Sequence, residues 1–510
     1  MGRITDWIRS VTQRMFGSQS FYKTAGVPHN AITTDMVKAI DDWCKLYQNE
    51  APWLIRDHHN LGLPARIASD IATMVTVEMQ MRITDPKVTT QEELKDGEKP
   101  KSRASFLYRE IKNVLEVIQQ QTEYACAKGG LVFKPYPDSN GGLSFDYVQA
   151  DDFYPCAYNS KGEITSAVFV SRKKEGSSWY TRVEKHELNG TRYTVTNQCF
   201  RAQGQNDDVG TPATLQEVPE WADLEEKVEI ENVDCPLFSY FRIPIGNTID
   251  SKSPLGVSVY ARAYQSGLIE KADKQYQSLM WEYEGGELAI DASKDAFKTT
   301  KGAPQLPEGK ERLYRMNTID GTTVNDKLME TFSPTLRDQS YINGLQAVLK
   351  QIEDCCGLSR GSLSDAEVDA RTATEIKMAK QRTYSTVTSI QRALENALKQ
   401  LVKACDFFAT LYSLAPEGEY DLQFVWDDSV IVDAETERQH DLDEVNAGIM
   451  QKWEYRKKWY GEDDATAKSM IVKEKSDDEL MGFGLNDKKP MNPEQARGQE
   501  QTKQEGGENE

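Results

Sequence analysis

Adjacent aspartates are the residues of this chain whose type and spacing could most directly support chemistry. Two-metal nucleases hold their ions with carboxylates, so these pairs raise the hypothesis of a metal-dependent nucleic-acid enzyme. Neighbouring side chains on a strand face opposite ways, however, and no histidine or lysine adjoins the pairs. A solvated surface is therefore the stronger interpretation. The pairs are Asp151-Asp152, Asp207-Asp208, Asp427-Asp428, Asp463-Asp464 and Asp477-Asp478.

The cysteines and histidines predict no zinc site and no disulfide framework. The 8 cysteines are scattered without any Cys-x-x-Cys pair, so we expect reduced, mostly buried thiols. The 5 histidines lack the spacing of metal ligands. The phosphate-loop, dinucleotide, zincin and serine-hydrolase motifs are also missing from the sequence. We therefore expect no cofactor and no enzymatic activity.

Basic residues gather in the segment 287–333, where they allow two interpretations. The segment could be a docking face for an acidic partner or for nucleic acid. Equally, it could be a solvated surface on which nearby aspartates and glutamates offset the charge. The basic side chains that would form the docking face are Lys294, Lys298, Lys301, Lys310, Arg312 and Arg315.

Residues 357–370 are predicted to form a loop rich in serine, glycine and aspartate between two helices. Its glycines ease backbone rearrangement, and Arg360 is its single cation. Loops of about this length are often plain connections between helices.

The overall charge limits the partners that the whole surface can bind. With 61 basic and 81 acidic residues among 510, the formal net charge is -20, which excludes a protein that coats DNA over its entire surface. No stretch approaches the roughly 20 apolar residues that cross a bilayer. The first residues lack an apolar core with a cleavage site, so we also expect no secretory signal.

The elements that must position these residues follow from the apolar periodicity. Helical spacing covers 33–80 and 103–127, and an alternating pattern broken by turn residues covers about 130–245. Asn189-Gly190 between two alternating runs is a strong hairpin signal. Helices followed by an antiparallel meander make the N-terminal half α+β.

The second half is predicted to be mainly helical. Ser253-Pro254 and Ser333-Pro334 each combine a good N-cap with a proline at the first helical position, so each predicts a helix start. The first helix would run to Tyr283 and the second to about Gly357, with a small β excursion between them. Further predictions are a long helix from Thr372 to about Tyr412, a strand at 421–426, a helical region at 434–475 and disorder at 485–510.

This order of elements resembles the portal proteins of tailed bacteriophages, in particular those of long-tailed phages of Gram-positive hosts. Five short strings carry the resemblance, which spans roughly 60–475, and their order is more specific than any one of them. They are Leu63 to Ala72 with Glu78, Asp152 to Pro155 leading to Gly162-Glu163-Ile164 and Val168-Phe169, Ser253 to Ser258, Cys356 to Ser359, and Thr372 to Ile376.

The resemblance implies an α+β, portal-like domain organisation with eight parts. These are a wing at 1–252, a stem helix at 253–284, a small β-rich clip at 285–333, a second stem helix at 334–356, a tunnel loop at 357–370, a long wing helix and strand at 371–429, a helical crown at 430–484 and a disordered tail at 485–510. Lys294 to Arg315 would then belong to the clip. The resemblance also implies that the tunnel loop meets DNA, where serine hydroxyls can touch phosphates without a fixed charge and Arg360 could contact DNA or pair with an acid of a neighbouring subunit. The candidate contact residues are Ser359, Arg360, Gly361, Ser362, Ser364 and Asp365.

The resemblance also implies partners and a location. Twelve copies would form a ring at one capsid vertex, with double-stranded DNA passing through its channel during packaging and ejection. The clip would dock the terminase large subunit and later a head-completion or adaptor protein, and the major capsid and scaffold proteins would surround the ring. Assembly would take place in the host cytoplasm, without a membrane. Two alternatives stay open: another phage ring or minor head protein, and the metal-dependent enzyme.

Overall fold

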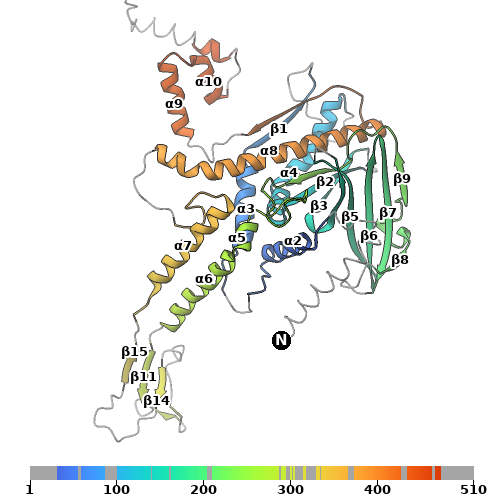
Figure 1. Cartoon of the computed structure of the whole chain (residues 1–510). Helices are drawn as coiled ribbons and strands as arrows, with labels where there is room; N and C mark the ends of the chain where they lie inside the picture. The colour runs from blue at the N-terminus through green and yellow to red at the C-terminus, as the bar shows by residue number, and fades with distance from the viewer. Residues whose placement is uncertain are drawn as a thin grey trace, which may run out of the picture. The chain divides into compact units, whose positions relative to one another are not determined.

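The computed structural model divides the chain into two units, Met1–Ile431 and Val432–Glu510 (Figure 1). It describes residues 32–54, 59–86, 100–138, 141–159, 162–203, 210–286, 289–293, 299–300, 303–304, 314–317, 329–332, 335–365, 373–426, 434–461, 464 and 466–471. The predicted disordered tail, 485–510, lies outside these residues. Helices and antiparallel sheets together confirm the α+β class.

Three helices, α2 (Thr34–Tyr47), α3 (Leu63–Thr76) and α4 (Arg103–Lys128), open the first unit. The last of them is the 103–127 helix of the sequence prediction. It begins at a reciprocal cap between Ser102 and Ser105 and ends at Gly129, whose φ of 93° only glycine adopts at low cost. Their apolar faces lie in one large core, with Trp43 and Phe106 fully buried.

The end of the first predicted helical region is wrong, because Met79–Thr84 forms strand β1. It pairs antiparallel with β16 (Asp421–Trp426), which is the strand expected from the sequence. Met81 and Ile83 are buried while Gln80 and Arg82 are exposed, which is the period-two pattern of a strand. The partner strand lies more than 300 residues away, so local periodicity gave little sign of the pairing.

Two antiparallel sheets lie between α4 and α5 (Ala261–Gln265) in the sequence. One has the order β10-β2-β3, and the other β4-β5-β6-β7-β8 with β9 also on β7. Asn189 pairs with Arg192 across the β6–β7 turn, so the predicted Asn-Gly hairpin is confirmed. The strands are β2 (Gly130–Pro137), β3 (Leu143–Gln149), β4 (Phe153–Tyr158), β5 (Ile164–Glu175), β6 (Ser178–Asn189), β7 (Arg192–Ala202), β8 (Thr211–Ala213), β9 (Lys227–Ile230) and β10 (Ser239–Arg242).

The helix predicted to start at Ser253-Pro254 starts later and is interrupted. Helix α5 covers Ala261–Gln265 and α6 covers Leu268–Gly285. Gly267, with a φ of 68°, interrupts the helical conformation between them. The segment before α5 is buried and bonded to distant backbone, since the Val259 N–H donates to the Cys126 carbonyl at 3.0 Å. These tertiary contacts outweigh the local helix signal, and the Ser253 hydroxyl accepts from the Leu255 N–H instead.

Helices α6 and α7 (Asp338–Cys356) lie side by side, and a β-rich insertion connects them (Figure 1). Helix α7 begins after the predicted Ser333-Pro334 and ends at Gly357 as expected, where φ is 73°. The insertion contains the sheet β14-β11-β15 and the pair β12-β13. The strands are β11 (Ala289–Ser293), β12 (Thr299–Thr300), β13 (Ala303–Pro304), β14 (Tyr314–Asn317) and β15 (Met329–Phe332).

Helix α8 (Ala373–Leu411) is the long helix of the sequence prediction. Its 39 residues correspond to about 58 Å at 1.5 Å per residue. The fully buried Leu394, Leu398 and Leu401 repeat at steps of three and four, which places one face of the helix on the core. It contacts β2 and β10, and the Ser239 hydroxyl donates to the Ala397 carbonyl at 2.5 Å.

The second unit contains α9 (Ala434–Asn446) and α10 (Lys452–Tyr460). The single helical region predicted for 434–475 is therefore split by a turn that includes Gly448, at a φ of 76°. No residue of α10 is buried. The described part of this unit contains several contacts between cations and aromatic rings, such as Lys468 Nζ at 4.3 Å from the ring centre of Trp453.

Candidate channel and docking site

The insertion between α6 and α7 contains the predicted docking residues. Arg315 lies in β14, which pairs parallel with β11, whereas Lys294, Lys298, Lys301, Lys310 and Arg312 lie outside the described residues. The small β excursion expected between the two helices is present, because β11, β14 and β15 form a sheet there. Whether their basic side chains dock a partner stays a prediction.

An ion pair closes the base of this insertion. The Arg337 guanidinium donates to both Glu282 oxygens, with its Nη2 atom at 2.8 Å from Oε2, and the Arg337 N–H donates to Oε1 at 3.0 Å. These hydrogen bonds hold the pKa of Glu282 below its usual value. The pair joins the last turn of α6 to the start of α7. The two helices therefore form a helical hairpin that is held together where the insertion begins and ends.

Much of this helical hairpin is exposed in the single chain. Only Ile269, Ala272, Asp273 and Leu279 are buried in α6, and the buried residues of α7 begin at Leu345. Trp281 is 72% exposed, and Leu336 is 39% exposed. An exposed tryptophan of this size is typical of a surface that another protein covers.

The first half of the predicted tunnel loop is an ordered turn built around one carboxylate. Glu353 of α7 is fully buried, and its Oε1 atom accepts from three backbone N–H groups. The donors are Gly361 at 3.1 Å, Leu363 at 2.6 Å and Ser364 at 2.8 Å. Its Oε2 atom accepts from the Ser364 hydroxyl at 3.0 Å. The φ of 89° at Gly361 belongs to this turn, and a side chain would strain it.

Two serines of the predicted DNA-contact set are engaged inside the protein. The Ser359 side chain bonds with Thr383 of α8, since the Thr383 hydroxyl donates to the Ser359 oxygen at 2.9 Å. Ser359 and Ser364 are 8% and 7% exposed. The Ser362 hydroxyl donates to the Ser359 carbonyl at 2.7 Å. In this conformation these hydroxyls bond within the protein, and their contact with DNA stays a prediction.

The charged members of the set lie at the surface. Arg360 donates to Asp354 at 3.4 Å, and Arg382 of α8 pairs with the other oxygen of Asp354. Asp365 is exposed, and its N–H donates to the Gln346 side chain at 2.8 Å. The structure therefore brings Ser359 to Asp365 together on one turn. Residues 366–370 of the predicted loop lie outside the described residues.

Sequence reasoning missed Glu353, although the sequence contained a signal for it. Leu349, Ile352 and Cys356 repeat at helical spacing, and all three are buried. Glu353 falls on the same buried face, four residues after Leu349. An acid at a core position must be paired with a cation or hydrogen-bonded, so the position itself predicts hydrogen-bond donors or a cation close to the carboxylate.

A second buried polar cluster joins the two larger sheets. Glu184 accepts from Lys134 at 2.7 Å and from Arg182 at 2.9 Å, and it bonds to one ring nitrogen of His186, whose other nitrogen bonds to Tyr193. The neighbouring cations hold the pKa of Glu184 well below its usual value, whereas burial lowers the pKa of His186. The row resembles a general-base arrangement, but all its members except Arg182 are less than 9% exposed, so a substrate cannot reach them.

The described residues give no further support to the metal-dependent alternative. Asp151 of the first aspartate pair accepts from Lys128 at 2.9 Å. Asp207-Asp208, Asp427-Asp428 and Asp477-Asp478 lie outside the described residues, and so does Asp463. In the part of the chain that the structure describes, no group of three or more histidines, cysteines, aspartates and glutamates could hold a metal ion.

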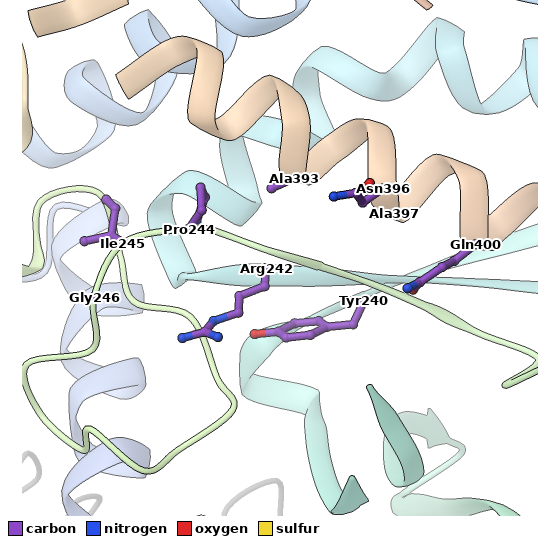
Figure 2. A pocket seen from close by; sticks show the side chains of 9 residues that line it. All are labelled: Tyr240, Arg242, Pro244, Ile245, Gly246, Ala393, Asn396, Ala397 and Gln400. Atoms are coloured by element: carbon purple, nitrogen blue, oxygen red, sulfur yellow. The ribbon is translucent and has the colours of Figure 1, made fainter. Parts of the chain in front are cut away.

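A pocket of about 450 Å³ lies between α8 and the end of β10 (Figure 2). Tyr240 and Arg242 contribute from β10, and Asn396 and Gln400 contribute from α8. None of the lining residues is acidic. Gly256 also closes on this region, since its N–H donates to the Tyr240 oxygen at 3.0 Å. The sequence analysis did not predict this pocket.

Of three comparisons with known proteins, the family comparison places the chain in a family. Residues 91–480 match the family model described as phage portal protein, SPP1 Gp6-like. A search of curated proteins finds no match. Among solved structures, a chain from the neck of a native GTA particle computed with C12 symmetry superposes with a TM-score of 0.39 and 10% identity, covering 83% of this chain and 92% of that chain. Because the family match covers more than half of its length, this chain belongs to the SPP1 Gp6-like family of phage portal proteins.

Membership confirms the resemblance noted from the sequence and makes a structural role in a phage particle the coarse function of the chain. Within the described residues, every helix is too short or too polar to cross a bilayer. The eight-part division into wing, stem, clip, tunnel loop, crown and tail stays a prediction.

Proposed function

We propose that twelve copies of this chain form a closed ring at one capsid vertex, with an axial channel through which double-stranded DNA is packaged and later ejected. The family match supports the portal role. The observation that supports the ring is the exposed face of α6 and α7, with Trp281 near the end of α6. In a closed ring each subunit meets its neighbour through two different faces, so a surface left open in one copy becomes covered.

The charge of the chain suits a conduit. A protein that lets DNA slide must not hold phosphates tightly, because each lysine or arginine contact adds a salt-dependent grip. With an excess of acidic residues and a net charge of -20, the surface as a whole repels DNA and leaves few places for such a grip. We propose no catalytic step for this chain.

The docking partners follow from the same proposal. The insertion between α6 and α7 is the segment we propose as the clip, where the terminase large subunit docks during packaging and a head-completion or adaptor protein docks afterwards. Its strands stand beyond the ion pair of Arg337 and Glu282, so the insertion can present them to a partner without disturbing the core. The major capsid and scaffold proteins would contact the wing.

Native mass spectrometry of the purified chain tests the ring. We expect one closed oligomer of twelve copies at moderate salt, visible as a ring with a central channel in electron micrographs. Monomers or dimers alone, over a range of salt and protein concentrations, would contradict the proposal. A ring that supports no packaging in a reconstituted reaction with prohead, terminase and DNA would contradict the conduit but not the assembly.

A further inference from the structure

Glu353 is a buried acid that neither the sequence motifs nor the proposed docking surfaces use. Among the described residues no lysine or arginine pairs with it, so its charge is met by three N–H dipoles and one hydroxyl. A buried carboxylate is stable only with such complete hydrogen bonding. The turn at residues 361–364 therefore closes around Glu353 as an amide cradle.

The cradle is also fixed to an earlier turn of α7 and to one further helix, α8. On the side of α7, the Asp365 N–H donates to Gln346 at 2.8 Å. On the side of α8, Ser359 and Thr383 exchange hydrogen bonds, and the Thr386 hydroxyl donates to the Gly357 carbonyl at 2.8 Å. Leu358 and Leu363 anchor the turn in the core, at 1% and 8% exposure.

We propose that Glu353 is a positioning residue, which holds residues 357–365 as a rigid extension of α7. A displacement of α7 along its axis is then carried directly to this turn, and through Ser359 to α8. This inference rests on the proposed function only for its role in DNA passage; the rigid connection itself is independent of it.

Hydrogen exchange measured by mass spectrometry in the full-length, assembled protein tests the connection. The variant Glu353→Gln keeps the shape but places an NH2 group against N–H donors, so at least one bond of the cradle is lost. We expect exchange in peptides covering 357–365 to rise by about tenfold or more, while peptides from β5 to β7 keep their wild-type rates.

The matched control is the neighbouring acid. Asp354 pairs with Arg360 and Arg382 at the surface, so Asp354→Asn removes an acid from the same helical turn without touching the cradle. Its exchange in 357–365 should stay within twofold of the wild type. Equal effects of the two variants, or wild-type exchange in Glu353→Gln, would overturn the proposal.

Two further measurements separate positioning from general stability. If Glu353→Gln prevents ring assembly, the experiment uses Ser364→Ala in its place. This variant removes only the hydrogen bond from the Ser364 hydroxyl to Glu353 Oε2. Unchanged exchange of residues 357–365 in Ser364→Ala would also overturn the proposal. In variants that assemble normally and retain the melting temperature, packaged DNA should fall several-fold. Normal packaging by a variant whose exchange is raised would contradict the positioning role of Glu353. A wild-type ring that packages no DNA would contradict only the proposed function.

Discussion

Two tryptophans of this chain show how burial decides what a residue does. Trp43 of α2 is fully buried in the large core of the first unit, whereas Trp281 near the end of α6 is 72% exposed. A buried indole contributes to the stability of the single chain. An exposed indole on a polar helix contributes little until another surface covers it.

Replacing Trp281 by alanine should therefore affect assembly more than folding. We expect the free energy of unfolding of the single chain to change by less than about 0.5 kcal/mol, because the side chain makes few contacts within it. The ring of the variant should dissociate at a higher protein concentration than the wild-type ring, because the contact between subunits is weaker. Urea unfolding and native mass spectrometry measure the two effects separately.

Trp43→Ala serves as the comparison for that experiment. Its expected cost is about 3–5 kcal/mol of folding stability, as for other large-to-small changes in a core. A ring unaffected by Trp281→Ala would show that α6 does not contribute its exposed face to the contact between subunits.

Gly129 and Gly256 form a close contact that only glycines permit. A Cβ atom at Gly129 would lie 2.7 Å from the Gly256 carbonyl oxygen, and the φ of 93° adds backbone strain. Gly129→Ala should therefore lower the free energy of unfolding by more than about 2 kcal/mol. Urea unfolding curves measure it.

Gly176 in the β5–β6 turn provides the matched control. Its φ is 60°, but no atom lies within 4 Å of an added Cβ. Gly176→Ala should cost about 1–2 kcal/mol from the backbone conformation alone. Equal losses in the two variants would show that the chain shifts to relieve the contact between Gly129 and Gly256.

At the scale of elements, the buried cluster of Glu184, His186, Lys134 and Arg182 ties the sheet β10-β2-β3 to the sheet that contains β6. Lys134 comes from β2, and the other three residues come from β6. Tyr193 of β7 completes the row, and Asp146 of β3 shares Lys134 at 3.1 Å. Removing one charge of such a cluster leaves the others buried and unpaired, which costs about 3–5 kcal/mol.

The same cluster predicts loss of stability in acid. The pKa of His186 lies below its unfolded value of 6.5, so the unfolded chain binds the proton more readily and stability falls as the pH drops below about 6.5. The pKa of Glu184 lies well below 4.5, so a second loss begins as the pH drops below about 4.5. Calorimetric melting temperatures between pH 4 and 8 should show both.

The variant Glu184→Gln checks the assignment of the second loss. At pH 7 it should lower the free energy of unfolding by about 3 kcal/mol, because Lys134 and Arg182 lose their shared acid. Its stability should also depend less on pH below about 4.5. An unchanged acid profile would assign that loss to other carboxylates.

Elements whose signals are local could be predicted from the sequence. Helix α8 follows from apolar steps of three and four, and the β6–β7 hairpin follows from Asn189-Gly190. Elements that depend on distant partners could not. Met79–Thr84 becomes a strand because β16 is beside it, and residues 253–260 are not helical because they fill a buried place against Cys126 and Tyr240.

The candidate site shows the same division. Its location between α7 and α8 could be predicted from helix ends and from the Ser-Gly composition. The inward direction of the Ser359 and Ser364 hydroxyls could not, because it depends on Thr383 in α8 and on Glu353 in α7. Spacing in the sequence does not show to which of several nearby groups a serine hydroxyl will form its hydrogen bond.

For the whole molecule, the insertion between α6 and α7 should be separable from the wing. Replacing residues 288–331 by a short linker leaves the bond between Arg337 and Glu282 and the packing of α7 on the core. We expect the wing to melt within a few degrees of the wild type and binding of the terminase large subunit to be lost. Calorimetry and a binding assay with purified terminase measure the two.

Removal of residues 485–510 is the control for that deletion. The segment is polar and has no apolar run, so its loss should change neither the melting temperature nor ring assembly. Unchanged terminase binding after the deletion of 288–331 would show that the motor docks elsewhere.

The pairing of β1 with β16 has a consequence for how the chain is made. About 340 residues lie between the two strands, and a ribosome adding about 5–20 residues per second needs roughly 17–70 s to synthesise them. Helix α8, which covers β10 and β2, also emerges late. The nascent wing therefore exposes an unpaired strand edge and an apolar sheet face for much of its synthesis, and both attract chaperones. Incomplete chains released before residue 426 should aggregate rather than join rings.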